Sequence, residues 1–116
     1  MNTCKNKPTE LFRSYNGVIS YSKINEDFII QYSNLLLRLE PSGFLSFREF
    51  VYTLDLENFE GICENDRCFI LKMPTNINFV FNKSEIKELR ELTSNALGIF
   101  KTLKMAHNCL NFNSYE

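Results

Sequence analysis

Two alternating apolar runs followed by a longer run with helical spacing occur twice in the sequence, and this order constrains the fold more than any other feature. Residues 28–32 and 35–39 alternate around a Ser33-Asn34 break, and residues 69–73 and 77–81 alternate around a break that contains a proline. Apolar side chains at every second position are typical of strands with one buried face. Because the breaks are short, each pair of runs predicts an antiparallel hairpin.

A helical pattern follows the first predicted hairpin. Its apolar residues recur three and four positions apart, which is the spacing of an amphipathic helix. Ser42 is the predicted N-cap of this helix, and the segment 55–61 is predicted to end it. The apolar stripe of the first helix consists of Phe44, Phe47, Phe50, Val51 and Leu54.

A second helix is predicted to start at Asn82, because Asn82 and Glu85 have the spacing of a capping box. Gly98 is a weak point inside this helix, and its end is expected near Ala106. Its apolar stripe consists of Ile86, Leu89, Leu92 or Thr93, Ala96, Leu97 and Phe100.

The remaining segments flank these two units. Residues 1–10 are predicted to be a polar leader and residues 107–116 an Asn-rich tail. Asn16-Gly17 separates two partly apolar runs, and Asn-Gly favours a type I′ turn, so a further hairpin is expected at the N-terminus. The predicted single domain covers residues 11–106, with units at about 28–56 and 69–106.

These elements predict an α+β fold. We expect an antiparallel β-sheet with two helices on one face, arranged as a ββα-ββα pseudo-repeat after the N-terminal hairpin. The units align at an offset of 41 residues (69 minus 28), which pairs Phe28 with Phe69 and Ile29 with Ile70. Duplication and convergence both produce such a pattern, and the sequence leaves both origins open.

The opposite face of the predicted sheet is unusually apolar. Four of its eight residues are aliphatic, whereas a sheet face in water is normally more polar. A second subunit, another partner or the N-terminal hairpin would explain this by covering the face, and scattered exposed aliphatic residues would also explain it. The candidate interaction surface consists of Ile29, Leu36, Arg38, Ile70, Lys72 and Val80.

Composition excludes several classes of partner. The chain has 116 residues, 44% of them hydrophobic, which suits one domain with a real core. With 13 basic and 14 acidic residues it lacks the basic surplus of a nucleic-acid binder. No apolar run reaches the roughly 18 residues that span a bilayer. Because residues 1–12 lack the apolar core of a signal peptide, we predict a cytoplasmic location with reduced cysteines.

Motifs for catalysis or metal binding are not found, so we predict no enzyme activity, no cofactor and no metal. His107 and Cys109 are two residues apart, and residues at that spacing do not face each other on a helix. Cys63 and Cys68 would form only half of a zinc site. A small-ligand pocket between helices and sheet remains an alternative function. Its possible walls are Phe47, Tyr52, Phe79 and Phe100, although their pattern favours plain core residues over a pocket.

The stretches FIIQYSNLLLRLEPSGFLSFREFV and FNKSEIKELRELTSNAL carry a family resemblance. They contain an apolar strand, an Asn-Leu-Leu turn into a second strand and a phenylalanine at a helix start. Over about residues 18–105 the chain resembles a family of small uncharacterised proteins from Bacteroidetes. The resemblance implies the fold and no activity. Together with the patterns above, it leads us to expect a non-enzymatic cytoplasmic domain that acts through protein contacts or self-association.

Overall fold

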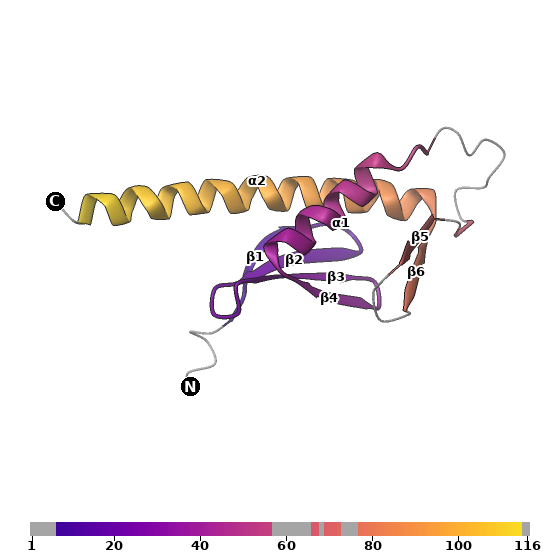
Figure 1. Ribbon diagram of the computed structural model, residues 1–116, viewed down its shortest axis with the longest axis horizontal. Helices are drawn as coiled ribbons and strands as arrows, with labels where there is room; N and C mark the ends of the chain where they lie inside the picture. The colour runs from indigo at the N-terminus through magenta and orange to yellow at the C-terminus, as the bar shows by residue number, and fades with distance from the viewer. Residues whose placement is uncertain (1–6, 57–65, 68, 73–76, 115–116) are drawn as a thin grey trace.

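The computed structural model describes residues 7–56, 66–67, 69–72 and 77–114, with residues 107–114 as backbone only (Figure 1). The order of its elements confirms the predicted ββ-ββα-ββα arrangement and the α+β class. The elements are β1 (Thr9–Arg13), β2 (Gly17–Ser22), β3 (Asp27–Tyr32), β4 (Leu35–Leu39), α1 (Pro41–Thr53), β5 (Phe69–Lys72), β6 (Asn78–Phe81) and α2 (Lys83–Ser114).

The strands form two antiparallel sheets, where the sequence predicted one. β1, β2, β3 and β4 pair in that order, and β5 pairs with β6 alone. Phe69 and Phe81 lie opposite each other across the small hairpin, and both are buried. The second sheet is therefore held to the molecule through its aromatic inner face and not through hydrogen bonds to β4.

Both helices lie on one face of the four-stranded sheet, as predicted (Figure 1). α1 packs on β3 and β4, the hairpin of its own unit. α2 makes its most extensive sheet contacts with β1 and β2, which lie outside its unit, and it also packs along α1. Because the two helices dock on different hairpins, the predicted pseudo-repeat is not confirmed.

The predicted inward faces form the core. Phe28 is buried in its centre, where its ring stacks on Phe44 with centroids 4.1 Å apart and meets Tyr21 and Phe100 edge-on. Ile77, which was predicted to face inward, is instead 55% exposed, because it precedes the first residue of β6. The buried residues of the two helical stripes are Phe44, Phe47, Val51, Ile86, Leu89, Leu92, Thr93 and Ala96.

The helix ends follow local chemistry that the sequence predicted only in part. The capping box at α2 is confirmed: the Asn82 N–H donates to Glu85 Oε1 at 2.9 Å, and the Glu85 N–H donates to Asn82 Oδ1 at 2.7 Å. α1 begins at Pro41 and not after a Ser42 cap, since proline suits the first helical position. At its other end, Arg90 of α2 donates to the carbonyls of Val51 and Leu54.

α2 extends beyond its predicted end near Ala106 and reaches Ser114. Gly98 lies inside the helix without breaking it, and a Cβ there would meet nothing within 4 Å. At the other end of the chain, β1 begins at Thr9, inside the segment predicted as a polar leader.

The hairpin at Asn16-Gly17 is confirmed, but its predicted type I′ turn is wrong. Asn16 has no positive φ angle; the positive φ angles of described non-glycine residues fall at Glu26 and Ser33, in the next two turns. Gly17 instead belongs to β2 and is buried. A Cβ there would lie 2.8 Å from the carbonyl oxygen of Gln31, so glycine is required by close packing of the backbone.

Candidate functional site

The residues of the predicted interaction surface point away from the core, as expected, but they lie in two separate sheets. Ile29, Leu36 and Arg38 belong to the four-stranded sheet, where Ile29 pairs with Arg38. Ile29 is half-buried, while Leu36 is 60% exposed. The N-terminal hairpin continues this same sheet at β3, so it does not cover the outer face.

The other half of the predicted surface is on the small sheet. Ile70 is 51% exposed and pairs with Val80, which is also exposed, and Lys72 is exposed on the same strand as Ile70. The alternation of side chains along each strand therefore predicted their orientation correctly. The sequence did not predict that Ile70, Lys72 and Val80 would lie on a different sheet from Ile29, Leu36 and Arg38.

Another exposed apolar region occurs on α2, in residues 99–106, which we call the α2 overhang. Figure 1 shows the C-terminal part of α2, in yellow, running past the four-stranded sheet. Every residue from 101 to 106 is exposed, including Leu103 at 48% and Met105 at 68%. The apolar spacing of three and four through Leu92, Ala96, Ile99 and Leu103 was the signal in the sequence that could have indicated a stripe longer than the sheet.

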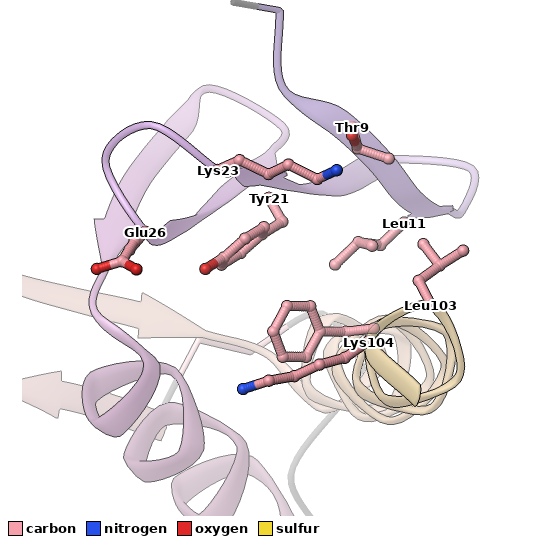
Figure 2. A pocket seen from close by; sticks show the side chains of 8 residues that line it. Thr9, Leu11, Tyr21, Lys23, Glu26, Leu103 and Lys104 are labelled. Atoms are coloured by element: carbon pink, nitrogen blue, oxygen red, sulfur yellow. The ribbon is translucent and has the colours of Figure 1, made fainter. Parts of the chain in front are cut away.

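An open cavity of about 530 Å³ lies between the N-terminal hairpin and α2 (Figure 2). Figure 2 shows Leu11 and Tyr21 on the strand side and Leu103 and Lys104 on the helix side. The turn between β2 and β3 adds Lys23 and Glu26 to the rim. The full lining consists of Thr9, Leu11, Tyr21, Lys23, Glu26, Phe100, Leu103 and Lys104.

This cavity is not the pocket that the sequence predicted. Of the four predicted aromatic walls, Phe100 alone lines it. Phe47 is buried in the core, and Phe79 is half-buried on β6. The sequence missed the cavity because nothing in it indicated that α2 docks on the N-terminal hairpin.

Tyr52, the fourth predicted wall, belongs to the contact between α1 and α2. Its hydroxyl is hydrogen-bonded to the hydroxyl of Ser94, and it also donates to the Arg90 carbonyl at 3.3 Å. The guanidinium of Arg48 lies 4.8 Å from the centroid of the Tyr52 ring, a cation–π distance. Tyr52 therefore joins the two helices.

The charges around the cavity are mostly cationic. Lys23 and Lys104 form no ion pair with any described residue, and neither does Glu26 on the same rim. The Lys104 ammonium is 5.8 Å from the centroid of the Phe100 ring. Burial, with smaller contributions from Glu26 and Asp27, raises the pKa of the Tyr21 hydroxyl, so Tyr21 is neutral near pH 7. The lining therefore carries two positive charges and one negative charge.

The carboxylate of Glu88 on α2 accepts four hydrogen bonds. It accepts from the hydroxyl of Ser14, from the backbone N–H of Asn16 at 2.8 Å, from the Asn16 side-chain amide at 2.9 Å and from the hydroxyl of Tyr32 at 2.8 Å. Burial alone would raise the pKa of Glu88, but these hydrogen bonds outweigh it and lower the pKa. Burial and the same contact raise the pKa of Tyr32.

These donors make Glu88 an anchor for the β1–β2 loop. A carboxylate with a lowered pKa is a weak proton acceptor near neutral pH, so the arrangement does not favour acid–base catalysis. Its four donors come from Ser14 and Asn16 in the β1–β2 loop and from Tyr32 of β3, which are far from α2 in the sequence. The sequence shows no sign of this cluster, because none of its residues has a spacing that relates it to Glu88.

The predictions about cysteine and histidine chemistry fall outside the described residues. They concern Cys4, Cys63, Cys68 and the side chains of His107 and Cys109. Within the described ranges, no three His, Cys, Asp or Glu side chains are grouped closely enough to hold a metal ion.

Comparison with protein families gives a match over nearly the whole chain. A family model described as a family of unknown function, DUF6686, matches residues 4–114. The chain belongs to the DUF6686 family. This confirms the resemblance found in the sequence to an uncharacterised family, although the match names no taxonomic group. No curated protein and no solved structure matches the chain.

Membership of DUF6686 implies no activity, because the family is one of unknown function. Among the helices of the described part, none contains a stretch that is both long and apolar enough to cross a membrane. The α2 overhang, the outer sheet faces and the open cavity expose apolar side chains among the described residues of this DUF6686 chain.

Proposed function

We propose that this DUF6686 chain acts through protein contacts and self-associates, with the α2 overhang as its main contact surface. The observation that carries the proposal is the exposure of Leu103 at 48% and of Met105 at 68% on one short helical segment. Burying such side chains contributes about 25 cal/mol for each Å² of apolar surface removed from water.

The length of α2 supports this reading. A helix of 32 residues is about 48 Å long, whereas the strands beneath it have five or six residues and span about 20 Å. Helices in proteins are stabilised mainly by packing of an apolar face. Within the α2 overhang Phe100 packs on Tyr21 and Phe28 of the sheet. Ile99, Leu103 and Met105 keep exposed apolar surface, which a packing partner would bury.

A second copy of the chain suits this surface. Ile99, Leu103 and Ala106 are spaced by four and three residues, which is the spacing at which two helices interlock side chains. Met105 lies beside this stripe and adds exposed apolar surface at its edge. Paired copies would each cover the other's stripe through the same patch, as in a two-fold dimer. Lys101 and Lys104 occupy the positions between these residues, where their charges stay in water. A cytoplasmic location is part of the same proposal, and fractionation of expressing cells would test it.

Substitutions in the α2 overhang are expected to weaken self-association. The double variant Ile99→Gln/Met105→Gln removes exposed apolar surface without touching the core, so its dissociation constant should rise at least about tenfold, equivalent to about 1.4 kcal/mol. Sedimentation velocity over a series of concentrations measures this change. Lys101→Gln introduces the same residue in the same segment with no loss of apolar area, and it should sediment like the unmodified chain. Equal dissociation constants for all three proteins would refute the role of the overhang.

The outer sheet faces are a second proposed contact surface, favoured by the exposure of Leu36 and Ile70. Because the two residues lie on separate sheets, Leu36→Asp and Ile70→Asp test the two faces independently. Each variant is expected to weaken association while keeping the urea unfolding midpoint of the unmodified chain. Loss of folding in either variant would show that its face belongs to the core, and unchanged association in both would remove the sheets from the proposal.

A further inference from the structure

We infer that the open cavity between α2 and the N-terminal hairpin binds an amphipathic organic anion, a molecule with an apolar body and a carboxylate or similar head group. This inference goes beyond self-association, although Phe100, Leu103 and Lys104 of the α2 overhang also line the cavity and Leu103 belongs to the proposed contact stripe. It rests on observations of its own. They are the size of the cavity, the apolar side chains that form its walls and the two ammonium groups at its rim.

The walls provide a preformed apolar site. A volume of about 530 Å³ lies within the range of about 300–1,000 Å³ that is usual for small-molecule sites. Leu11 is almost fully buried at one side of it. Phe100 is held by ring contacts with Tyr21 at 4.7 Å and with Phe28 at 4.9 Å between centroids. An apolar ligand would therefore meet a wall that is already ordered by the core.

The charges at the rim of the cavity favour a negatively charged head group. Lys23 comes from the turn after β2 and Lys104 from α2, so the two ammonium groups approach the cavity from opposite elements. Within the described part of the chain, no carboxylate forms an ion pair with either lysine. An anion placed between them gains attraction from two charges and is opposed by Glu26 on the rim and, from farther away, by Asp27, which also acts on Tyr21. A cationic head group would be repelled by both lysines and attracted by the carboxylate of Glu26.

Ligands that share one alkyl chain and differ in the head group test this inference. Isothermal titration of the full chain with decanoate, decan-1-ol and decylammonium keeps the apolar body constant. Decanoate is expected to bind at least about tenfold more tightly than decan-1-ol, and decylammonium should bind most weakly. Equal affinity for decanoate and decan-1-ol, or no binding of decanoate, would overturn the inference.

Lysine variants test whether Lys23 and Lys104 bind the anionic head group. Lys23→Gln/Lys104→Gln should lower the affinity for decanoate at least about tenfold and leave the affinity for decan-1-ol unchanged. Lys101→Gln lies on the same helix but does not line the cavity, and it should bind decanoate like the unmodified chain. The Ile99→Gln/Met105→Gln variant should also keep decanoate binding, which separates this site from the self-association surface. An unaltered affinity for decanoate in the double lysine variant would contradict the assigned role of the rim.

Discussion

Replacing Phe28 with alanine is expected to lower the free energy of unfolding by about 3–5 kcal/mol. The Phe28 ring is almost fully buried and contacts the rings of Phe44, Tyr21 and Phe100. Its removal leaves a cavity that links the sheet to both helices, and the rigid core closes such a space only in part. Urea unfolding followed by circular dichroism measures the loss.

The neighbouring residue provides the control. Ile29 follows Phe28 on β3 but points to the outer face, where it is half-buried. Ile29→Ala is therefore expected to cost about 1 kcal/mol or less. If Ile29→Ala destabilised the chain as much as Phe28→Ala, the assignment of the two sheet faces would be wrong.

Replacing Glu88 with alanine is expected to cost about 2–3 kcal/mol. The change removes four hydrogen bonds to one carboxylate, and each such bond contributes about 0.5–1.5 kcal/mol. The expected loss lies at the lower end of the summed contributions, because the site is partly exposed and water can accept hydrogen bonds from some of the donors that lose Glu88. The same urea experiment measures the effect. If Glu88→Ala lowered the free energy of unfolding by less than about 0.5 kcal/mol, the usual size of a surface substitution, the β1–β2 loop would not be stabilised by Glu88.

The contribution of Glu88 should also depend on pH. Its pKa is lowered in the folded chain, so the stabilisation is present above the ordinary pKa of 4.5 and is lost as pH falls through the folded value. The difference in unfolding free energy between the unmodified chain and Glu88→Gln, which cannot ionise, should therefore shrink below about pH 4.5. A difference that stayed constant or grew in this range would contradict the assigned hydrogen bonds.

Local patterns in the sequence predicted the elements and their faces well. Alternation placed Phe28 and Ile30 inside and Leu36 outside, and the spacing of Asn82 and Glu85 predicted a cap that both side chains form. These features depend on residues that are close in the chain. For the same reason the outward orientation of the candidate surface residues was predictable.

The arrangement of the helices and strands could not be predicted, because it depends on contacts between residues that are far apart in the sequence. The docking of α2 on β1 and β2 joins residues far apart in the chain, and it creates both the Glu88 cluster and the open cavity. Gly17 shows the difference between a local pattern and a long-range contact. The Asn-Gly pair predicted a turn of particular geometry, whereas the fold uses this glycine because the backbone of β3 and the side chain of Leu92 leave no room for a Cβ. The separation of β5 and β6 into their own sheet was unpredictable for the same reason.

Sedimentation equilibrium of the unmodified chain tests self-association through the α2 overhang most directly. The single chain has a mass of 13.6 kDa. We predict that the fitted mass rises with concentration toward twice this value, and that the Ile99→Gln/Met105→Gln variant needs a higher concentration to reach it. A fitted mass that stays equal to the mass of the single chain at every concentration would contradict self-association.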